Sequence, residues 1–321
     1  KVSALILCLA LCLGIAACGD KSSGGAAEVA VWSALNSEKI MRDVTYTDRA
    51  PAAFKVQAYR NETEGGQILM TPNGRVNSYS IALADLKTAD GQTLSKDTMT
   101  VYNQKYVEVI NPTKSFPTGW YPDALLPMEK AIEYGENKIE ANENQAIYIS
   151  VSVPKTQAAG VYTGTFTLTV DGRDIAVPAT VEVWDYTLSD ENHLRTVFSI
   201  HRYWGEAGII SGELDSTWDM YQKYYDYLVD YRISPRYLTG SAGDIDTFIE
   251  KAIIATRDPR VTTYVLPYQA QGGGLNMVHY KTLMTRMMEA SLSEGINLFT
   301  KAVTYFSMFD EANVSPAKIA L

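Results

Sequence analysis

The spacing of the apolar residues changes once along this chain, near residue 188, and the change divides it into two parts of different fold class. Before it, apolar and polar residues alternate with a period of two, as in strands with one buried face. After it, short apolar runs alternate with segments in which apolar residues recur at helical spacing. We therefore expect an all-β domain over residues 29–188 and an α/β domain over residues 193–321.

The first part is predicted to be a β-sandwich, because its strands follow one another without intervening helices. A hairpin is expected at Asp171-Gly172, a turn pair between two alternating runs. Residues 111–126, which carry three prolines and several aromatic residues, are expected to form an ordered loop. This part has no evident nucleophile, metal-binding pattern or phosphate loop, so we expect it to be a scaffold or a binding module. The predicted strands are 54–59, 78–86, 100–110, 145–153, 161–170 and 175–184.

The second part alternates strands and helices four times, which predicts a parallel sheet. No strand is followed by a GxGxxG or P-loop motif, so a barrel is favoured over a nucleotide-binding doubly wound sheet. A (β/α)₈ barrel needs about 250 residues, and roughly half of that is present. We therefore expect a truncated (β/α)₈ barrel, and since the chain begins with Lys1 rather than Met, a missing start as well. The predicted strands are 194–201, 233–238, 261–267 and 302–309, and the predicted helices are 215–231, 241–256 and 277–294.

Export is predicted from the first residues of the chain. Lys1 precedes a short apolar run and then the stretch Ile15-Ala16-Ala17-Cys18, which resembles a bacterial lipobox. We expect residues 1–17 to be a lipoprotein signal peptide, Cys18 to be lipidated, and residues 18–28 to be a flexible, lipid-anchored linker. The alternative is an ordinary signal peptide with a chance cysteine. The expected location is the bacterial cell envelope, at the outer membrane or cell surface.

The charge of the mature chain excludes several classes of partner. Once the predicted signal is removed, 27 Lys and Arg residues face 37 Asp and Glu residues. An acidic chain is a poor match for nucleic acid or for an anionic lipid surface, so membrane contact is expected through the lipid anchor only. Cys8 and Cys12 lie inside the signal, so no free thiol remains for disulfides, redox chemistry or a metal.

Polar and aromatic residues follow the predicted strands of the second part, where a barrel places its site. His201 and Trp204 follow the first strand, Tyr268 follows the third, and Asp310, Glu311 and Asn313 follow the fourth. Aromatic rings can stack on a sugar while amides and carboxylates bind its hydroxyls, so we expect these residues to bind or act on carbohydrate. Each has a structural alternative: His201 as a hydrogen-bonded wall residue, Trp204 as part of the core, and Asp310 as the cap of the following helix.

Carboxylate chemistry is the reaction type that the residues favour. No G-x-S-x-G motif occurs, and the three scattered histidines do not form a metal-ligand set, so neither a metal nor a cofactor is expected. Glycosidases that use two facing carboxylates place them on opposite sides of the scissile bond. The adjacent Asp310 and Glu311 fit instead a substrate-assisted reaction, in which one carboxylate orients the acetamido group of the sugar and the other is acid and then base.

Several stretches together resemble glycoside hydrolase family 123. They are residues 144–154, 159–164 and 183–188, the loop 121–127 and the pair Asp310-Glu311. The resemblance implies a sandwich followed by a (β/α)₈ barrel and a β-N-acetylgalactosaminidase activity. It also implies that Asp310 orients the acetamido group and that Glu311 is the acid/base.

The resulting expectation is a retaining, substrate-assisted exo-β-N-acetylhexosaminidase. Its substrate would be a glycan or glycolipid that ends in N-acetylhexosamine. One alternative is a non-catalytic, surface-anchored glycan-binding lipoprotein, and another is a hydrolase of the same fold that acts on a different sugar. We expect the chain of residues 18–321 by itself to be inactive, because half of the barrel wall would be absent.

Overall fold

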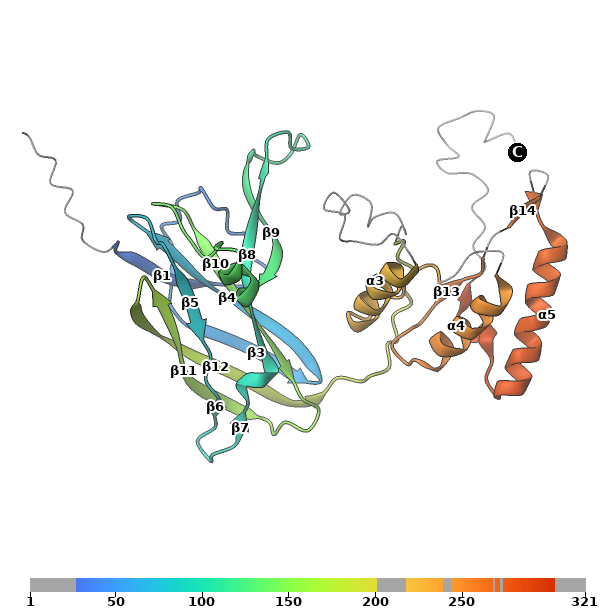
Figure 1. The fold of residues 1–321 in the computed structure, drawn as a ribbon. Helices are drawn as coiled ribbons and strands as arrows, with labels where there is room; N and C mark the ends of the chain where they lie inside the picture. The colour runs from blue at the N-terminus through green and yellow to red at the C-terminus, as the bar shows by residue number, and fades with distance from the viewer. Residues whose placement is uncertain (1–26, 201–217, 239–243, 268, 272–273, 304–321) are drawn as a thin grey trace, which may run out of the picture. The chain divides into compact units, whose positions relative to one another are not determined.

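Two units make up the chain in the computed structural model, which describes residues 27–200, 218–238, 244–267, 269–271 and 274–303 (Figure 1). The first unit ends at Thr187 and the second begins at Leu188. Each unit has a hydrophobic core of its own. Among the described residues, no helix is long and apolar enough to cross a membrane.

The first unit is built from two six-stranded sheets. The first sheet has the order β2-β1-β4-β10-β8-β9, and the second has the order β3-β12-β11-β6-β7 with β5 paired to β11. The strands of the first sheet are β1 (Val29–Ala34), β2 (Ala50–Pro51), β4 (Glu62–Pro72), β8 (Met99–Val109), β9 (Gly119–Pro127) and β10 (Gln145–Val153). Those of the second are β3 (Phe54–Arg60), β5 (Tyr79–Ala82), β6 (Leu86–Lys87), β7 (Thr93–Leu94), β11 (Gly160–Val170) and β12 (Arg173–Thr187). A 3₁₀ turn, η1 (Lys96–Thr98), and a short helix, α1 (Met128–Glu133), join strands of this unit.

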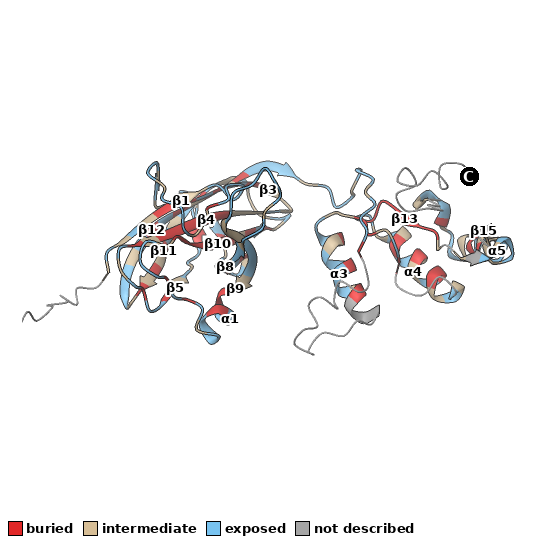
Figure 2. Cartoon of the chain, turned by 90° about the horizontal axis from the view of Figure 1, so that it is seen from above, coloured by how far each residue is buried: buried red, intermediate tan, exposed pale blue. Residues whose placement is uncertain are grey.

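The two sheets share one core, because in most of their long strands alternate residues are apolar and turned inward. Figure 2 shows the buried residues, in red, recurring along the strands of this unit. The prediction of a strand-rich first part with alternating burial is confirmed. The core includes Ile68 and Met70 of β4, Ile147 and Ile149 of β10, Phe166 and Leu168 of β11, and Val177 and Val181 of β12.

The hairpin predicted at Asp171-Gly172 is confirmed, since β11 and β12 are antiparallel and paired from Gly160–Val183 to Val170–Arg173. Asp171 has φ 46° and Gly172 has φ 75°, the left-handed backbone that a two-residue turn of this kind requires. Asp171 Oδ1 also accepts hydrogen bonds from the backbone N–H of Asn77 (2.9 Å) and Ser78 (3.0 Å). The turn is therefore tied to the start of β5.

The loop predicted over residues 111–126 is partly wrong. Residues 119–127 form β9, which is antiparallel to β8, with a register shift between Gln104 and Tyr106. Pro122 and Pro127 lie inside this strand. Proline is tolerated there because β9 is the edge strand of its sheet, so a missing N–H leaves no neighbour unpaired.

The described residues of the second unit include three amphipathic helices whose apolar sides form its core. They are α3 (Trp218–Asp230), α4 (Ile245–Arg257) and α5 (Met277–Glu294). Asp244 caps α4 by accepting the N–H of Thr247 (3.0 Å), and Gly295 ends α5 in the left-handed conformation at φ 63°. The core is formed by Tyr221, Tyr225 and Val229 of α3, Phe248, Ile249, Ala252 and Ala255 of α4, Leu283 and Met287 of α5, and the segments between them.

Four extended segments of this unit are parallel neighbours in the order of the chain. Phe198 forms a parallel bridge with Pro235, and β13 (Tyr264–Val265) pairs in parallel with β16 (Ala302–Val303). The N–H of Val265 bonds to the carbonyl of Arg236 (2.8 Å), which links the two pairs. The regular strands are shorter than predicted, but the parallel alternation of strand and helix is present. Whether this sheet closes into a (β/α)₈ barrel stays a prediction.

Candidate functional site

All the site residues predicted from the sequence lie outside the described residues. This applies to the predicted catalytic pair Asp310 and Glu311, to His201, Trp204, Tyr268 and Asn313, and to the lipidation site Cys18. Their roles remain predictions. What the structure gives is the framework that leads into these positions.

The segment before the Asp310-Glu311 pair is anchored by Lys301. Its ammonium group donates hydrogen bonds to the carbonyls of Ala255 (3.1 Å) and Asp258 (2.6 Å), at the C-terminal end of α4. A cation at this end satisfies carbonyls that the helix leaves unpaired. Burial lowers the pKa of Lys301, and the nearby Asp258 opposes that shift. This contact holds the start of β16 against α4.

A small hairpin follows the third strand of the second unit. Its strands are β14 (Ala270–Gln271) and β15 (Gly274–Leu275), and it leads into α5. Asn276 caps α5 by accepting the N–H of His279 (3.1 Å). Its side chain also donates to Gln269 Oε1 (2.9 Å), and its N–H bonds to the Gln269 carbonyl (2.9 Å). The amide of Gln269 is therefore used to close the hairpin.

His279 lies in the first turn of α5 and was not among the site residues predicted from the sequence. Its Nε2 is buried and has no hydrogen-bond partner within the described part of the chain. The only sequence signal for the position was its place just after the glycine-rich loop. Within the described ranges, no three His, Cys, Asp or Glu side chains come together as a metal site.

A small pocket of about 210 Å³ lies between α3 and α4. Tyr225 lines it, and the Tyr225 hydroxyl is buried without a partner among the described residues. Burial is the main cause that raises the pKa of this hydroxyl. Asp258 and Arg260 also line the pocket and form an ion pair of 2.7 Å. The charges of Asp258 and Arg260 are therefore neutralised by each other.

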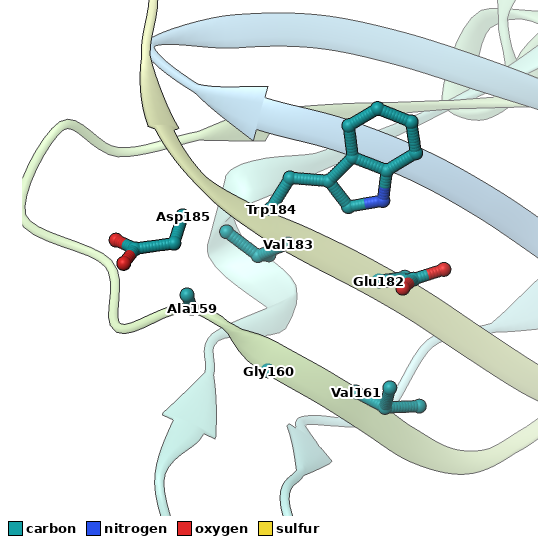
Figure 3. A pocket seen from close by; sticks show the side chains of 7 residues that line it. All are labelled: Ala159, Gly160, Val161, Glu182, Val183, Trp184 and Asp185. Atoms are coloured by element: carbon teal, nitrogen blue, oxygen red, sulfur yellow. The ribbon is translucent and has the colours of Figure 1, made fainter.

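A second group of polar and aromatic side chains lies on the outer face of the second sheet of the first unit. Trp184 of β12 lies beside two shallow hollows, of about 540 Å³ and 240 Å³. Figure 3 shows its ring standing clear of the strand, with Glu182 on the same strand and Asp185 directed away from it. Tyr59 of β3 is its register partner, and the two rings meet edge to face at 5.1 Å.

Comparison with known proteins identifies the first unit. Residues 37–170 match the family model described as the glycoside hydrolase 123 N-terminal domain. The match covers most of both sheets, from the segment after β1 to the end of β11. No curated protein sequence matches the chain.

One solved structure resembles both units. It is a family 123 glycoside hydrolase from Clostridium perfringens that was analysed for its hydrolysis of glycolipid glycans. The TM-score is 0.55 at 12% sequence identity, and the match covers 89% of this chain and 60% of that enzyme. At this identity the likeness concerns the fold. The chain spans 60% of the length of the enzyme it matches.

Two further structures are similar only in part. The fimbrial subunit MyfA from Yersinia enterocolitica has a TM-score of 0.24 at 10% identity, over 49% of this chain and 99% of its own. A β-glucosidase from Listeria innocua has a TM-score of 0.21 at 11% identity, over 51% of this chain and 17% of its own. Neither likeness is strong enough to support an argument. The family model, supported by the fold of the Clostridium enzyme, confirms the resemblance expected from the sequence: the first unit of this chain is a glycoside hydrolase 123 N-terminal domain.

Proposed function

We propose that the protein is a retaining, substrate-assisted exo-β-N-acetylhexosaminidase whose preferred terminal sugar is N-acetylgalactosamine. The observation that carries the proposal is the likeness to a family 123 glycoside hydrolase, which extends over 89% of the chain and so beyond the N-terminal domain. That enzyme acts on glycolipid glycans, which is the substrate class proposed here.

The order of the second unit supports a (β/α)₈ barrel as the catalytic domain. Its parallel segments follow one another in space as they do along the chain, which is the order of strands around a barrel. In a barrel, the residues that follow the C-terminal ends of the strands form the site. Asp310 and Glu311 follow β16 in the sequence and Tyr268 follows β13, and this order along the chain supports their proposed role in the site.

The proposed mechanism uses the acetamido group of the substrate as the nucleophile. The acetamido oxygen attacks the anomeric carbon while Glu311 donates its proton to the departing glycosidic oxygen. Asp310 accepts a hydrogen bond from the acetamido N–H and stabilises the positive charge of the oxazolinium intermediate. Glu311 then takes a proton from water, which opens the intermediate at the anomeric carbon with overall retention. We expect the neighbouring Asp310 charge to raise the pKa of Glu311 and keep it protonated for the first step.

Substrate assistance is tested by removing the acetamido group from the substrate. The natural full-length protein should release p-nitrophenol from the β-N-acetylgalactosaminide and not from the matching β-galactoside, which has the same ring and linkage. A thiazoline analogue of the cyclised intermediate should inhibit at concentrations at least ~100-fold below KM. Equal rates on both substrates would contradict the mechanism. If the protein binds the sugars and cleaves neither, it is a glycan-binding protein instead.

We also propose that the mature protein begins at Cys18, carries lipid on that residue and is held at the bacterial cell envelope. Residues 18–28 would then be the tether between the membrane and the N-terminal domain, and residues 29–188 and 193–321 the two domains. The composition of the tether, rich in Gly and Ser, supports a flexible link. An anchored hydrolase of this kind would meet glycans or glycolipids outside the cell.

A further inference from the structure

An exposed aromatic surface on the N-terminal domain is the strongest unexplained feature of the described residues. Three rings form it: Tyr59 at the end of β3, and Trp184 and Tyr186 on β12. Trp184 is 42% exposed and Tyr186 is 58% exposed. Large aromatic side chains gathered on an exposed surface are a common sign of a binding surface.

The alternation of the strands explains why the three rings share one face. Val181 and Val183 of β12 are buried in the core, so Glu182 and Trp184 are turned to the outside. Tyr186 lies within the irregular register after Trp184, and its ring reaches the same group through its contact with Tyr59. In β3 the same rule buries Ala58 and turns Tyr59 outward. The outer face of this sheet therefore carries an aromatic group instead of the polar side chains expected there.

The rings hold one another in fixed orientations. Tyr59 meets Trp184 at 5.1 Å and 81°, and meets Tyr186 at 5.3 Å and 72°, both edge to face. Arg60 fixes the strand ends beside them through Asp185 (2.7 Å) and Thr187 (3.0 Å). A surface with its rings already oriented loses little conformational entropy when a flat ligand binds.

Hydrogen-bond acceptors surround the rings, and each is oriented by a neighbour. Glu182 accepts from the side chain of Gln57 (2.6 Å) and Glu62 accepts from the N–H of Tyr59 (2.7 Å). Glu64 accepts from the Asn36 amide (3.3 Å). Each of these three carboxylates retains further lone pairs that can accept hydrogen bonds from a ligand.

We propose that this surface is a second carbohydrate-binding site, formed by residues other than the proposed catalytic ones, which takes a neutral pyranose oligosaccharide. A ligand that covers the rings must present an apolar face to them and hydroxyl donors to the carboxylates, and a pyranose does both. A purely apolar ligand would leave the carboxylates desolvated and unpaired, at high cost. No Lys or Arg lines either of the two described hollows, and the charge of the neighbouring Arg60 is paired with Asp185 at 2.7 Å, so sialylated or sulfated glycans lack an unpaired counter-charge there.

The proposal does not depend on the proposed hydrolase activity, because it concerns binding of sugars that lack an acetamido group. The probes are lactose and a cellulose-derived tetrasaccharide, with sialyllactose as the anionic comparison, measured by saturation-transfer difference NMR with the natural protein. Saturation should reach the ring protons of the neutral sugars and be weaker for sialyllactose. The thiazoline analogue, which occupies the proposed catalytic site, should leave the signal unchanged.

Two substitutions locate the site. Trp184→Ala and Tyr186→Ala should each weaken binding of the neutral sugars by about tenfold or more, since both remove a contact ring. The matched control is Tyr134→Ala, at a tyrosine of the same unit that is 63% exposed and lies beyond α1, and it should bind as the wild type does. Circular dichroism melts identify any variant that fails to fold.

Three results would overturn the proposal. They are no saturation of any neutral sugar at millimolar concentration, equal saturation in the folded Trp184 and Tyr186 variants, or a change of oligomeric state on Trp184→Ala. The last would make this surface a protein interface.

Discussion

The hydroxyl groups of Ser234 and Thr262 lie 3.1 Å apart in the interior of the second unit, at the starts of two neighbouring extended segments. Ser234 Oγ also accepts the N–H of Thr262 (2.8 Å), and the N–H of Ser234 bonds to Thr196 Oγ1 (2.7 Å) on the segment before. Three consecutive parallel segments are thus joined by hydroxyl groups, of which those of Ser234 and Thr262 belong to buried residues. In a barrel this end supports stability, while the opposite end carries the site.

Ser234→Ala should destabilise the second unit by about 1–3 kcal/mol, because it leaves the buried N–H of Thr262 without its acceptor. Chemical denaturation, with the unfolding transition of the second unit analysed separately, measures the lost free energy of unfolding. Ser293→Ala, at an exposed serine in α5, is the control and should change stability by less than about 0.5 kcal/mol. Equal effects of the two substitutions would show that the hydroxyl network contributes nothing.

Alkaline pH should destabilise the second unit through Tyr264. This side chain is buried and donates a hydrogen bond to the Leu298 carbonyl. Burial raises its pKa from 10.0 to about 12, so the folded state holds a proton that the unfolded state releases in this interval. The stability that the protonated Tyr264 contributes is fully present below pH 10 and is lost as the pH rises to 12. Over this interval the free energy of unfolding should fall by about 1.4 kcal/mol per pH unit.

Tyr264→Phe should remove that part of the slope of unfolding free energy against pH. The control is Tyr227→Phe, at an exposed tyrosine of α3 that is 58% accessible, which should keep the wild-type slope. Denaturant titrations at several values between pH 9 and pH 12 make the comparison. An unchanged slope in Tyr264→Phe would refute the assignment.

The turn at Asp171-Gly172 gives a test of the sandwich. Gly172 has φ 75°, where a Cβ is unfavourable, so Gly172→Ala should cost about 1 kcal/mol or more of stability. Asp171→Asn should cost much less, because asparagine tolerates the left-handed backbone and keeps the acceptor for Asn77 and Ser78. Thermal melts of the two variants compare their losses of stability. A smaller loss of stability in Gly172→Ala than in Asp171→Asn would contradict the turn geometry.

The sequence predicted the parts of the fold whose strands have one buried face and missed those that do not. In β4, residues 66–70 are buried in succession, so no alternation shows in the sequence. A second cluster formed by Trp32, Ile40, Leu69 and Ala146 covers the outer side of the sheet there. The edge strand β9 was hidden by its prolines, since their effect depends on a place in the sheet that only the tertiary structure defines.

The candidate sites show a similar division. The Asp310-Glu311 pair was found from its position after an apolar run, because the chemistry and the strand end are both local in sequence. The aromatic surface was not found, although Trp184 ends a predicted strand and Tyr186 lies in the stretch 183–188 that resembles family 123. It requires Tyr59, which comes from a strand that is distant in sequence and parallel to β12. Residues that meet only through such long-range strand pairing leave no pattern in a local stretch of sequence.

Cys18 provides a test of the proposed location. Cys18→Ser should move the protein from the membrane fraction to the soluble extracytoplasmic fraction and abolish incorporation of radiolabelled palmitate, because the lipid is attached through the thiol. Cys12→Ser, inside the predicted signal, is the matched control and should leave both unchanged. Palmitate labelling that survives Cys18→Ser would contradict the assignment.

The central claim is that an adjacent carboxylate pair works with the acetamido group of the substrate. It is tested most directly by kcat on p-nitrophenyl β-N-acetylgalactosaminide for the natural full-length protein, for Glu311→Gln and for Asp310→Asn. The account predicts that both substitutions lower kcat by at least about 100-fold, because each removes a separate contribution to the transition state. It also predicts that added azide does not rescue Asp310→Asn, since no enzyme carboxylate is the nucleophile, whereas azide can react in Glu311→Gln because it needs no general base. A Glu311→Gln protein with wild-type kcat, or recovery of Asp310→Asn as a glycosyl azide, would contradict it.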